Sequence, residues 1–447
     1  MSYPNLSKYL STYAEPEAQS FPSHLLADHS FDFGLTLPLR GEDPHEIEQR
    51  LVSLRELLGQ HGKRVIVVAV INGAGTKQSE YEKANQDLIS FLDSQSPEWN
   101  DSFFLQNQSP FLSVLWVDRA IRRPFGDKQG VGLARKIGCD LLIRFRYQNK
   151  LRSPWLFTTD ADASLPEDYF NIPHSSATAF HFPYRHDAKG FEGKEALTLY
   201  EIHLRYYFLG LLWANSPYAY PTIGSCLAIN ADSYVQVRGF QDRQAGEDFH
   251  LLNKLRKLGP LEYRHSYPIT LRGRFSQRVP FGTGQSTIEI HEQLNREVPF
   301  TLYPPAAFSF LKSFLSQMTD ALSQDSTKGL SQVTDYFSTL SAYHPTLFEC
   351  LQTLQVPKIV KEAFQSRPKP EPRIRHFHTS FDALKTLRLI HLLEERSFPR
   401  LPWTEALQGA IFCDFSDEIQ TPDKALASLQ ALEEKSLGTL FNCDRSF

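Results

Sequence analysis

WLFTTDAD, residues 155–162, is an apolar run that ends in two carboxylates one residue apart. The run predicts a buried β-strand at residues 155–159, so that Asp160 and Asp162 lie just beyond its carboxyl end. Open α/β sheets bind ligands at the carboxyl ends of their strands. Two carboxylates there can hold a hard divalent cation, Mg²⁺ or Mn²⁺, which in turn neutralises a diphosphate. A solvated turn at the end of a strand can also contain Asp-Ala-Asp, so the prediction of a metal site depends on the surrounding sequence.

Short β-branched runs alternate with helical stretches on both sides of this strand, from about residue 30 to residue 290. Because parallel neighbours need a crossover connection, the alternation predicts an α/β fold in which helices flank a parallel or mixed sheet. We expect strands at residues 33–39, 65–71, 111–117 and 179–183, and helices at residues 44–58, 79–93, 130–138, 192–214 and 247–258.

The pattern changes near residue 300, where one amphipathic segment follows another. It predicts an all-α C-terminal region. One helix is expected at residues 379–396, and another begins with Thr421 as the cap and Pro422 at the first helical position. Residues 366–372, SRPKPEP, are expected to form an extended linker, because proline is excluded from helix interiors.

The chain has 447 residues, a length that suggests two or three domains. We expect an N-terminal extension at residues 1–29, a catalytic domain at residues 30–295, and a helical domain at residues 296–447 that packs on it or mediates oligomer formation. Lys and Arg number 47 against 51 Asp and Glu, and the net charge of −4 argues against a nucleic-acid partner. Apolar residues make up 41% and charged residues 22%, which excludes a disordered chain.

Three features of the sequence predict a cytoplasmic protein. No run of about 18 apolar residues is present, so no transmembrane segment is expected. The N-terminus MSYPNLSKYL lacks the charged and apolar regions of a signal peptide. The cysteines are odd in number and far apart, which indicates reduced thiols rather than a disulfide framework or a zinc site. They are Cys139, Cys226, Cys350, Cys413 and Cys443.

Glu247 and Asp248 open the helix predicted at residues 247–258. Two adjacent carboxylates at a helix start face the positive end of the helix dipole, which favours their ionised forms. An ionised carboxylate can take a proton from an acceptor hydroxyl, as a general base does. The same electrostatics makes acidic residues common at helix starts that have no catalytic role.

Three arginines, Arg272, Arg274 and Arg278, lie in the glycine-rich stretch LRGRFSQRVPFGTGQ, residues 271–285. A guanidinium group matches phosphate oxygens with two parallel hydrogen bonds, and glycines let the backbone approach a ligand. The stretch therefore predicts a loop that closes over a diphosphate or binds a phosphorylated acceptor. A solvated basic loop has the same composition.

A series of short segments resembles the family 2 glycosyltransferases and their relatives with the GT-A fold. The segments are, in order, LPLRGE, VIVVAVINGAG, GVGLARKIG, LFTTDADASLP, GSCLAINADSY, RGF and GED. They span roughly residues 30–285, and the resemblance lies in their order and spacing, since each segment alone is a loose match. It implies a GT-A mixed sheet flanked by helices and the transfer of a sugar from a nucleotide-sugar donor to an unidentified hydroxyl acceptor.

The resemblance also implies roles for individual residues. In the family the second Asp of the D-x-D motif ligates the metal, which implies Asp162 with Mg²⁺ or Mn²⁺, assisted by Asp160. Some relatives place a third metal ligand in the region of His265, where a structural histidine is the alternative. The Asp of the E-D pair is the base of inverting members, which implies Asp248 with support from Glu247. The implied donor-binding residues are Pro38, Leu39, Arg40, Glu42, Asn72, Gly73 and Asp160. Arg135, in the glycine-punctuated helix, is a further donor-binding candidate from its position alone, with a surface role as the alternative.

The sequence departs from the family pattern at three positions. Ile71 replaces the Asp that holds the base, Gly41 replaces an Asn after the first strand, and Lys136 replaces an Asn of the helix. The resemblance therefore does not imply which nucleotide base the donor carries. The Q-x-x-R-W signature of processive synthases is absent, which favours a soluble enzyme that adds a single sugar.

Three alternatives stay open on the sequence alone. A retaining transferase of the same fold is one, because the sequence does not reveal the stereochemistry. A nucleotidyltransferase also uses a nucleotide fold and metal-binding aspartates, but its glycine-rich, lysine-bearing loop after the first strand is not present. A non-catalytic nucleotide-sugar-binding module can keep the fold as well, although the two aspartates argue against it.

Overall fold

The protein is described by a computed structural model at residues 4–73, 80–95, 98–413 and 421–440. The chain divides into two compact units. The first consists of Met1–Glu192 and Thr222–Ser286, and the second of Gly193–Pro221 and Thr287–Phe447. The second unit therefore combines one segment from the middle of the chain with its C-terminal part.

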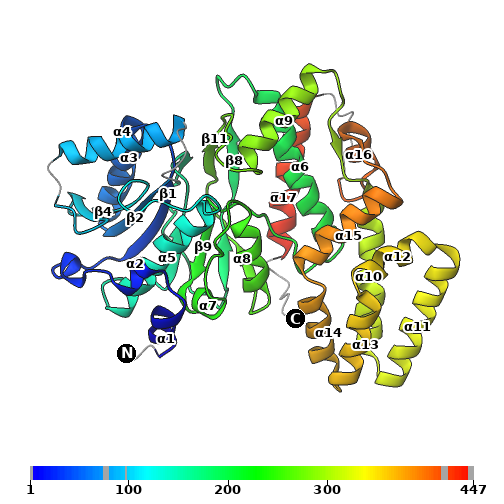
Figure 1. Ribbon diagram of the computed structural model, residues 1–447. Coiled ribbons are helices and arrows are strands. Elements are labelled where there is room, and N and C mark those ends of the chain that lie inside the picture. Colours follow the sequence, from blue (N-terminus) through cyan, green and yellow to red (C-terminus); the bar gives the residue numbers. More distant parts are fainter. Residues whose placement is uncertain (1–3, 74–79, 96–97, 414–420, 441–447) are drawn as a thin grey trace. The chain divides into compact units, whose positions relative to one another are not determined.

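The first unit contains an eight-stranded mixed sheet (Figure 1). The strands are β1 (Phe33–Leu39), β2 (Val65–Asn72), β3 (Phe103–Ser109), β4 (Leu112–Arg119), β5 (Trp155–Thr158), β7 (Ala179–His181), β9 (Leu227–Asn230) and β10 (Leu261–Tyr263). Their order is β10–β7–β9–β5–β1–β2–β4–β3. β1 is parallel to β2 and β5, whereas β9 is antiparallel to β5 and β7. The prediction of a mixed sheet in an α/β fold is thus confirmed.

A second, smaller sheet follows from the end of β5. Its strands are β6 (Ala163–Ser164), β8 (Tyr184–Asp187) and β11 (Ile269–Arg272). β11 lies in the middle, antiparallel to β6 and parallel to β8. The pairing of β6 with β11 places the residues that follow Asp162 beside the start of the arginine-rich stretch.

Side chains of β1 alternate between two helix layers. Leu35 and Leu37 belong to an apolar cluster with Leu51 and other residues of α3 (Pro44–His61) and α4 (Glu80–Ser94). Thr36 faces the opposite way, against α5 (Val131–Tyr147), where a Cβ on Gly138 would lie 2.3 Å from it. Only a glycine lets α5 approach the strand this closely. The sheet is therefore covered on both faces, as its nearly continuous apolar strands require.

The carboxyl ends of β1, β2 and β5 lie at one edge of the sheet, because these strands are parallel neighbours. From β1 the chain moves to β2 and β4, and it returns through α5 to β5 on the other side of β1. The strand order thus reverses between β1 and β5, and open α/β sheets bind ligands at such a point. Arg40 follows one of these two strands, and Asp160 and Asp162 follow the other.

The N-terminal residues of the chain are anchored to α5 by one buried carboxylate. The hydroxyls of Tyr9 and Tyr234 donate to Asp140 Oδ1 at 2.6 and 2.9 Å, and Lys136 Nζ lies 2.8 Å from Oδ2. The backbone N–H of Glu15 donates to the same Oδ2 at 2.8 Å. These contacts join α1 (Pro4–Thr12) and α7 (Ala231–Gln236) to α5. Lys136, which replaces an Asn of the family pattern, therefore contacts Asp140 and the N-terminal residues.

Asp140→Ala is expected to lower the free energy of unfolding by about 3 kcal/mol or more, because it removes the nearer of the two carboxylates beside the buried Lys136 and the shared acceptor of two buried hydroxyls. Urea denaturation of the full chain measures the change. Asp28→Asn is the matched control, since Asp28 is exposed and should change stability by less than about 0.5 kcal/mol. Equal stability of the two variants would show that the cluster does not anchor the N-terminal helices.

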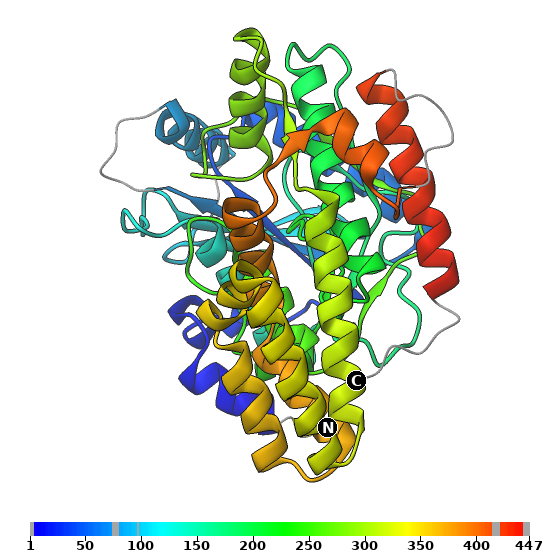
Figure 2. The ribbon, with the colours of Figure 1, turned by 90° about the vertical axis from the view of Figure 1, so that its right-hand side faces the viewer.

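The second unit is mainly helical, and Figure 2 shows its helices from the side. α10 (Pro305–Ser323) packs against α11 (Ser326–Tyr343) and α14 (Pro370–Ser380), and α6 (Lys194–Trp213) packs against α17 (Pro422–Leu440). Strands β12 (Thr301–Leu302) and β13 (Leu401–Pro402) form an antiparallel pair, so the prediction of an all-α region is wrong at this ladder. No helix among the residues described in either unit is long and apolar enough to cross a membrane. The helices of the unit are α6 (Lys194–Trp213), α10 (Pro305–Ser323), α11 (Ser326–Tyr343), α12 (Pro345–Thr353), α13 (Val356–Ser366), α14 (Pro370–Ser380), α15 (Ala383–Arg396), α16 (Trp403–Gly409) and α17 (Pro422–Leu440), with α9 (Thr283–Asn295) leading into it.

Two further differences from the predicted elements have physical reasons. The linker predicted at residues 366–372 is wrong, because α14 already begins at Pro370. A proline is tolerated in the first turn of a helix, where the N–H that it lacks has no partner within the helix. β3 was not predicted, because the second half of its sequence, FFLQNQS, is polar. The structure explains this composition, since β3 is an edge strand and is partly exposed over most of its length.

Candidate functional site

The site is built on a buried arginine that reaches two carboxylates from different elements. Arg135 lies in the second turn of α5, and its side chain is 5% exposed. Its Nη2 lies 2.5 Å from Oδ1 of Asp160, which follows β5, and its Nη1 forms an ion pair with Oε1 of Glu247. Glu247 is the first residue of α8 (Glu247–Arg256). Arg135 thus connects the end of β5 to the start of α8.

Glycine creates the space that this arginine needs. A Cβ on Gly224 would lie 2.6 Å from the guanidinium of Arg135. A Cβ on Gly132, one turn earlier in α5, would lie 2.5 Å from the backbone oxygen of Gln241. Gly224 therefore leaves room for the guanidinium, and Gly132 lets the start of α5 approach the backbone of Gln241.

Asp248 is the second residue of α8 and is partly buried beside Glu247. Its Oδ1 accepts the backbone N–H of Phe249 at 2.7 Å. Burial and the charge of Glu247 raise the pKa of Asp248 to about 7, and Arg135 opposes this rise. A carboxylate with a pKa near neutrality can accept a proton and hold it, as a general base must.

Asp248→Asn is expected to raise the melting temperature at pH 8 but not at pH 4. Because the pKa rises from 3.8 to about 7 on folding, the folded protein keeps a proton that the unfolded chain loses in this range. Wild-type stability therefore falls as the pH rises from about 4 to about 7, and asparagine has no such loss.

Melting curves from pH 4 to pH 8 test this expectation. Asp232→Asn is the matched control, because Asp232 is also the second residue of its helix but is exposed. A difference between Asp248→Asn and wild type that does not change with pH would contradict the raised pKa.

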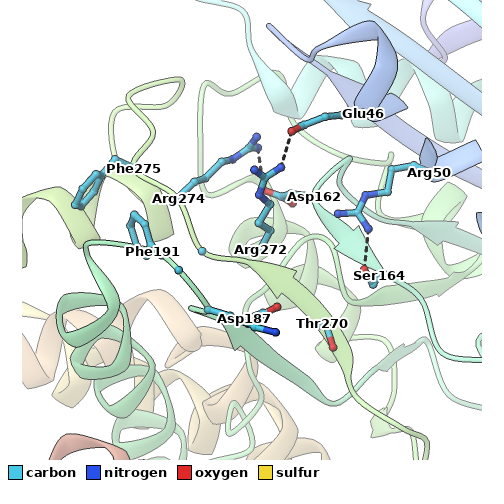
Figure 3. Close-up of a pocket in the computed structure, with 13 residues that line it drawn as sticks. Glu46, Arg50, Asp162, Ser164, Asp187, Phe191, Thr270, Arg272, Arg274 and Phe275 are labelled. Atoms are coloured by element: carbon cyan, nitrogen blue, oxygen red, sulfur yellow. Dashed lines mark hydrogen bonds and ion pairs between the residues drawn. The ribbon is translucent and has the colours of Figure 1, made fainter. Parts of the chain in front are cut away.

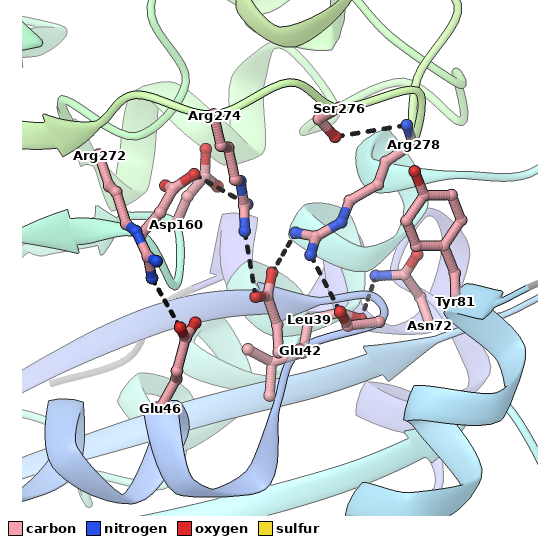
Figure 4. Close-up of polar contacts among 12 residues, drawn as sticks. Leu39, Glu42, Glu46, Asn72, Tyr81, Asp160, Arg272, Arg274, Ser276 and Arg278 are labelled. Carbon is pink, nitrogen blue, oxygen red and sulfur yellow. Dashed lines mark hydrogen bonds and ion pairs between the residues drawn. The ribbon is translucent and has the colours of Figure 1, made fainter. Parts of the chain in front are cut away.

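The arginine-rich stretch lies over the carboxyl ends of β1 and β5 (Figure 4). Arg274 Nη2 lies 2.8 Å from Asp162 Oδ2, and its Nη1 lies 3.4 Å from Glu42 Oε2. Arg278 forms an ion pair with Glu42 and donates to the backbone oxygen of Gly41 at 2.9 Å. The structure thus brings two of the predicted phosphate-binding arginines to the predicted donor-binding edge, where each contacts a carboxylate.

The remaining arginines take different positions. Arg272 pairs with Glu46 at 2.6 Å in an exposed ion pair. Arg40 donates to the backbone oxygen of Arg278 at 3.0 Å. The guanidinium groups of Arg40 and Arg278 both lie over the ring of Tyr81, at 5.9 and 5.7 Å from its centre. Tyr81, which the sequence analysis did not select, therefore joins the two arginines at this edge.

Three of the implied donor-binding residues make contacts inside the sheet: Pro38, Leu39 and Asn72. Pro38 and Leu39 are buried inside β1, paired with Val70 and Ile71 of β2. The side-chain amide of Asn72 donates to the backbone oxygen of Leu39 at 2.8 Å. These contacts hold the ends of β1 and β2 together.

The metal-ligand set consists of carboxylates. Asp160 and Asp162 supply the hard oxygen atoms that Mg²⁺ and Mn²⁺ prefer, and each is already paired with an arginine. His265 is exposed in the segment between β10 and β11. Among the residues that the structure describes, no group of three or more His, Cys, Asp or Glu side chains is arranged to hold a metal. A cation at Asp160 and Asp162 would fit only if a ligand and water completed its shell, which is usual for Mg²⁺.

A cavity of about 560 Å³ adjoins the site on the side of α3 (Figure 3). We call it the side cavity. Asp162 and Arg274 line it and also belong to the site described above. Most of its lining could not be predicted from the sequence, because these residues come from segments that are distant in sequence and match no motif. The lining consists of Glu46, Arg50, Asp162, Ser164, Asp187, Lys189, Gly190, Phe191, Thr270, Arg272, Gly273, Arg274 and Phe275.

Comparison with known proteins finds similarity to solved structures only. No protein-family model matches the sequence, and no curated protein matches it significantly. Among solved structures, the mannosyltransferase PcManGT from Pyrobaculum calidifontis, in complex with GDP-Man and Mn²⁺, is similar over 86% of this chain and 94% of its own. The two share 12% sequence identity with a TM-score of 0.34.

Proposed function

We propose that the protein is a glycosyltransferase of the GT-A type that transfers a sugar from a nucleotide-sugar donor to a hydroxyl acceptor. One observation supports this most: Arg135 connects Asp160, at the reversal point of the sheet, to the E-D pair of α8. The proposal does not rest on the structural likeness to the mannosyltransferase.

The donor is proposed to lie along the edge formed by Arg40, Glu42 and Asp160. Arg274 and Arg278 would exchange their carboxylate partners for oxygens of the diphosphate, since guanidinium groups bind both groups in the same geometry. Asp160 and Asp162 would hold Mg²⁺ or Mn²⁺. That ion would supply charge stabilisation for the departing nucleoside diphosphate.

Asp248 is proposed to be the base of an inverting transfer. Its carboxylate takes the proton of the acceptor hydroxyl as the oxygen attacks the anomeric carbon, while the bond from that carbon to the diphosphate breaks. Glu247 is a positioning residue, because its buried side chain is engaged by Arg135. Arg135 in turn opposes the rise in the pKa of Asp248.

A cytoplasmic location belongs to the same proposal. Cys139, Cys226, Cys350 and Cys413 are free and buried, as is common in proteins of reducing compartments. Cys443 lies outside the described residues.

We expect Mn²⁺ to raise the affinity for GDP or UDP, because two carboxylates alone complete only part of a metal's coordination shell. Asp162→Asn should reduce this Mn²⁺-dependent affinity by about ten-fold or more, the lower range seen for groups that act on a metal only indirectly. Calorimetric titration with and without Mn²⁺ measures both effects.

Asp28→Asn is the control in these titrations, because Asp28 is exposed. If neither nucleotide binds to the wild type, the donor assignment is wrong. If a nucleotide binds equally well with and without Mn²⁺, the metal is not part of the site.

Asp248→Asn should lower turnover by about 10²-fold or more, with little change in donor affinity, as the loss of a general base does. In the wild type, activity should fall as the pH drops below about 7, because Asp248 becomes protonated. Steady-state transfer measured from pH 5 to pH 9, with the donor found in a screen of GDP- and UDP-sugars, tests both points.

Glu247→Gln is the comparison variant, and it should lower turnover less than Asp248→Asn. The anomeric configuration of the product adds an independent readout. Near-normal turnover of Asp248→Asn together with a retained configuration would contradict the inverting mechanism.

A further inference from the structure

We propose that the side cavity binds a small polyhydroxylated compound that carries a phosphate group, with Arg50 and Lys189 as the residues that hold the phosphate. The cavity belongs entirely to the first unit. The binding proposal stands on its own residues, and only its link to sugar transfer rests on the proposed function.

The charge of the lining favours an anion. Arg50, Lys189 and two further arginines face three carboxylates in the cavity, which leaves a net charge of 4 − 3 = +1. Arg272 and Arg274 are already paired with Glu46 and Asp162. Arg50 and Lys189 have no carboxylate partner among the described residues.

The guanidinium of Arg50 is positioned by a neutral hydrogen-bond partner, the hydroxyl of Ser164. Its Nη1 donates to the Ser164 hydroxyl at 2.7 Å, which connects α3 to β6 (Figure 3). The guanidinium keeps further N–H donors for a ligand, because it carries five in total. A phosphate monoester has a charge of about −1.5 to −2 at neutral pH, which two otherwise unpaired cations match.

The rest of the lining suits a sugar or polyol. Ser164 and Thr270 offer hydroxyl groups, and Asp187 offers carboxylate oxygens that accept hydrogen bonds from ligand hydroxyls. The ring centres of Phe191 and Phe275 lie 4.7 Å apart in an edge-to-face arrangement, and the two rings provide apolar surface for the carbon atoms of a sugar ring. Pockets that combine apolar walls with a few placed polar groups are typical small-molecule sites.

The side cavity is connected to the candidate donor site. Asp162 and Arg274 line the cavity, and the same pair lies at the end of β5. A ligand in the cavity therefore contacts the ion pair that diphosphate binding would open. If the proposed function holds, the two ligands affect each other's affinity, whether the cavity ligand is the sugar acceptor or an effector.

Calorimetric titration of the full chain with glucose 6-phosphate and with glycerol 3-phosphate tests the proposal. Saturable binding is expected, with glucose as a neutral probe that binds far more weakly. Arg50→Gln and Lys189→Gln should each weaken binding by about ten-fold or more, the cost of a lost hydrogen bond to a charged group.

Two control variants separate charge from structure. Arg55→Gln removes an exposed arginine of α3 that does not line the cavity, and it should leave the affinity unchanged. Ser164→Ala removes the partner of Arg50 but keeps its charge, so it should have a smaller effect than Arg50→Gln. Melting curves confirm that each variant is folded.

Absence of saturable binding to both phosphates, or equal affinity of wild type and Arg50→Gln, would overturn the cavity proposal. GDP and UDP are titrated separately with Mn²⁺. Failure of nucleotide binding alone would overturn the proposed function and leave the cavity assignment standing. Mass spectrometry of glucose 6-phosphate incubated with the protein and its donor then distinguishes the two roles of the cavity ligand. A glycosylated product identifies an acceptor, and binding without product identifies an effector.

Discussion

The buried guanidinium of Arg135 is the interaction on which the first unit's site depends. A cation that is 5% exposed is costly to remove from water unless carboxylates compensate it, and here Asp160 and Glu247 do so from two different elements. The start of α5, the end of β5 and the start of α8 are therefore fixed relative to one another. Glycines at positions 132 and 224 provide the necessary close approaches. Because Glu247 is held inward by Arg135, Asp248 remains beside a like charge, and this charge contributes to the raised pKa.

A second set of charges lies where the carboxyl ends of β1 and β5 meet. Arg274 pairs with both Glu42 and Asp162, and Arg278 pairs with Glu42, so two of the predicted diphosphate-binding arginines already contact anionic groups. A carboxylate and a phosphate present similar oxygen atoms to a guanidinium group. In the donor complex that we propose, the diphosphate would replace these carboxylates at the arginines. The side cavity shares one of these pairs, which joins its chemistry to that of the strand ends.

Much of the fold could be predicted because its signals are local. The buried run at residues 65–71 has no polar residue, and the structure places it in the middle of the parallel strands as β2. The prolines at positions 370 and 372 lie in the first turn of α14 and not in a linker, because a proline is compatible with either. Lys136 stands where the family pattern has an Asn, and in the structure it faces Asp140 and anchors the N-terminal helix. Spacing along a helix does not reveal what the chain elsewhere places against it.

The sequence by itself determined where strands end and which ionisable residues follow them, as with Asp160 and Asp162 after β5. These features depend on apolar patterns and helix signals within a few residues. Only the tertiary structure decided which charges meet. Arg135 and Glu247 are 112 positions apart, and Arg278 and Glu42 are 236 apart. Electrostatic interaction depends on distance in space and on the exclusion of water, and both are set by the folded packing of remote segments rather than by their order along the chain.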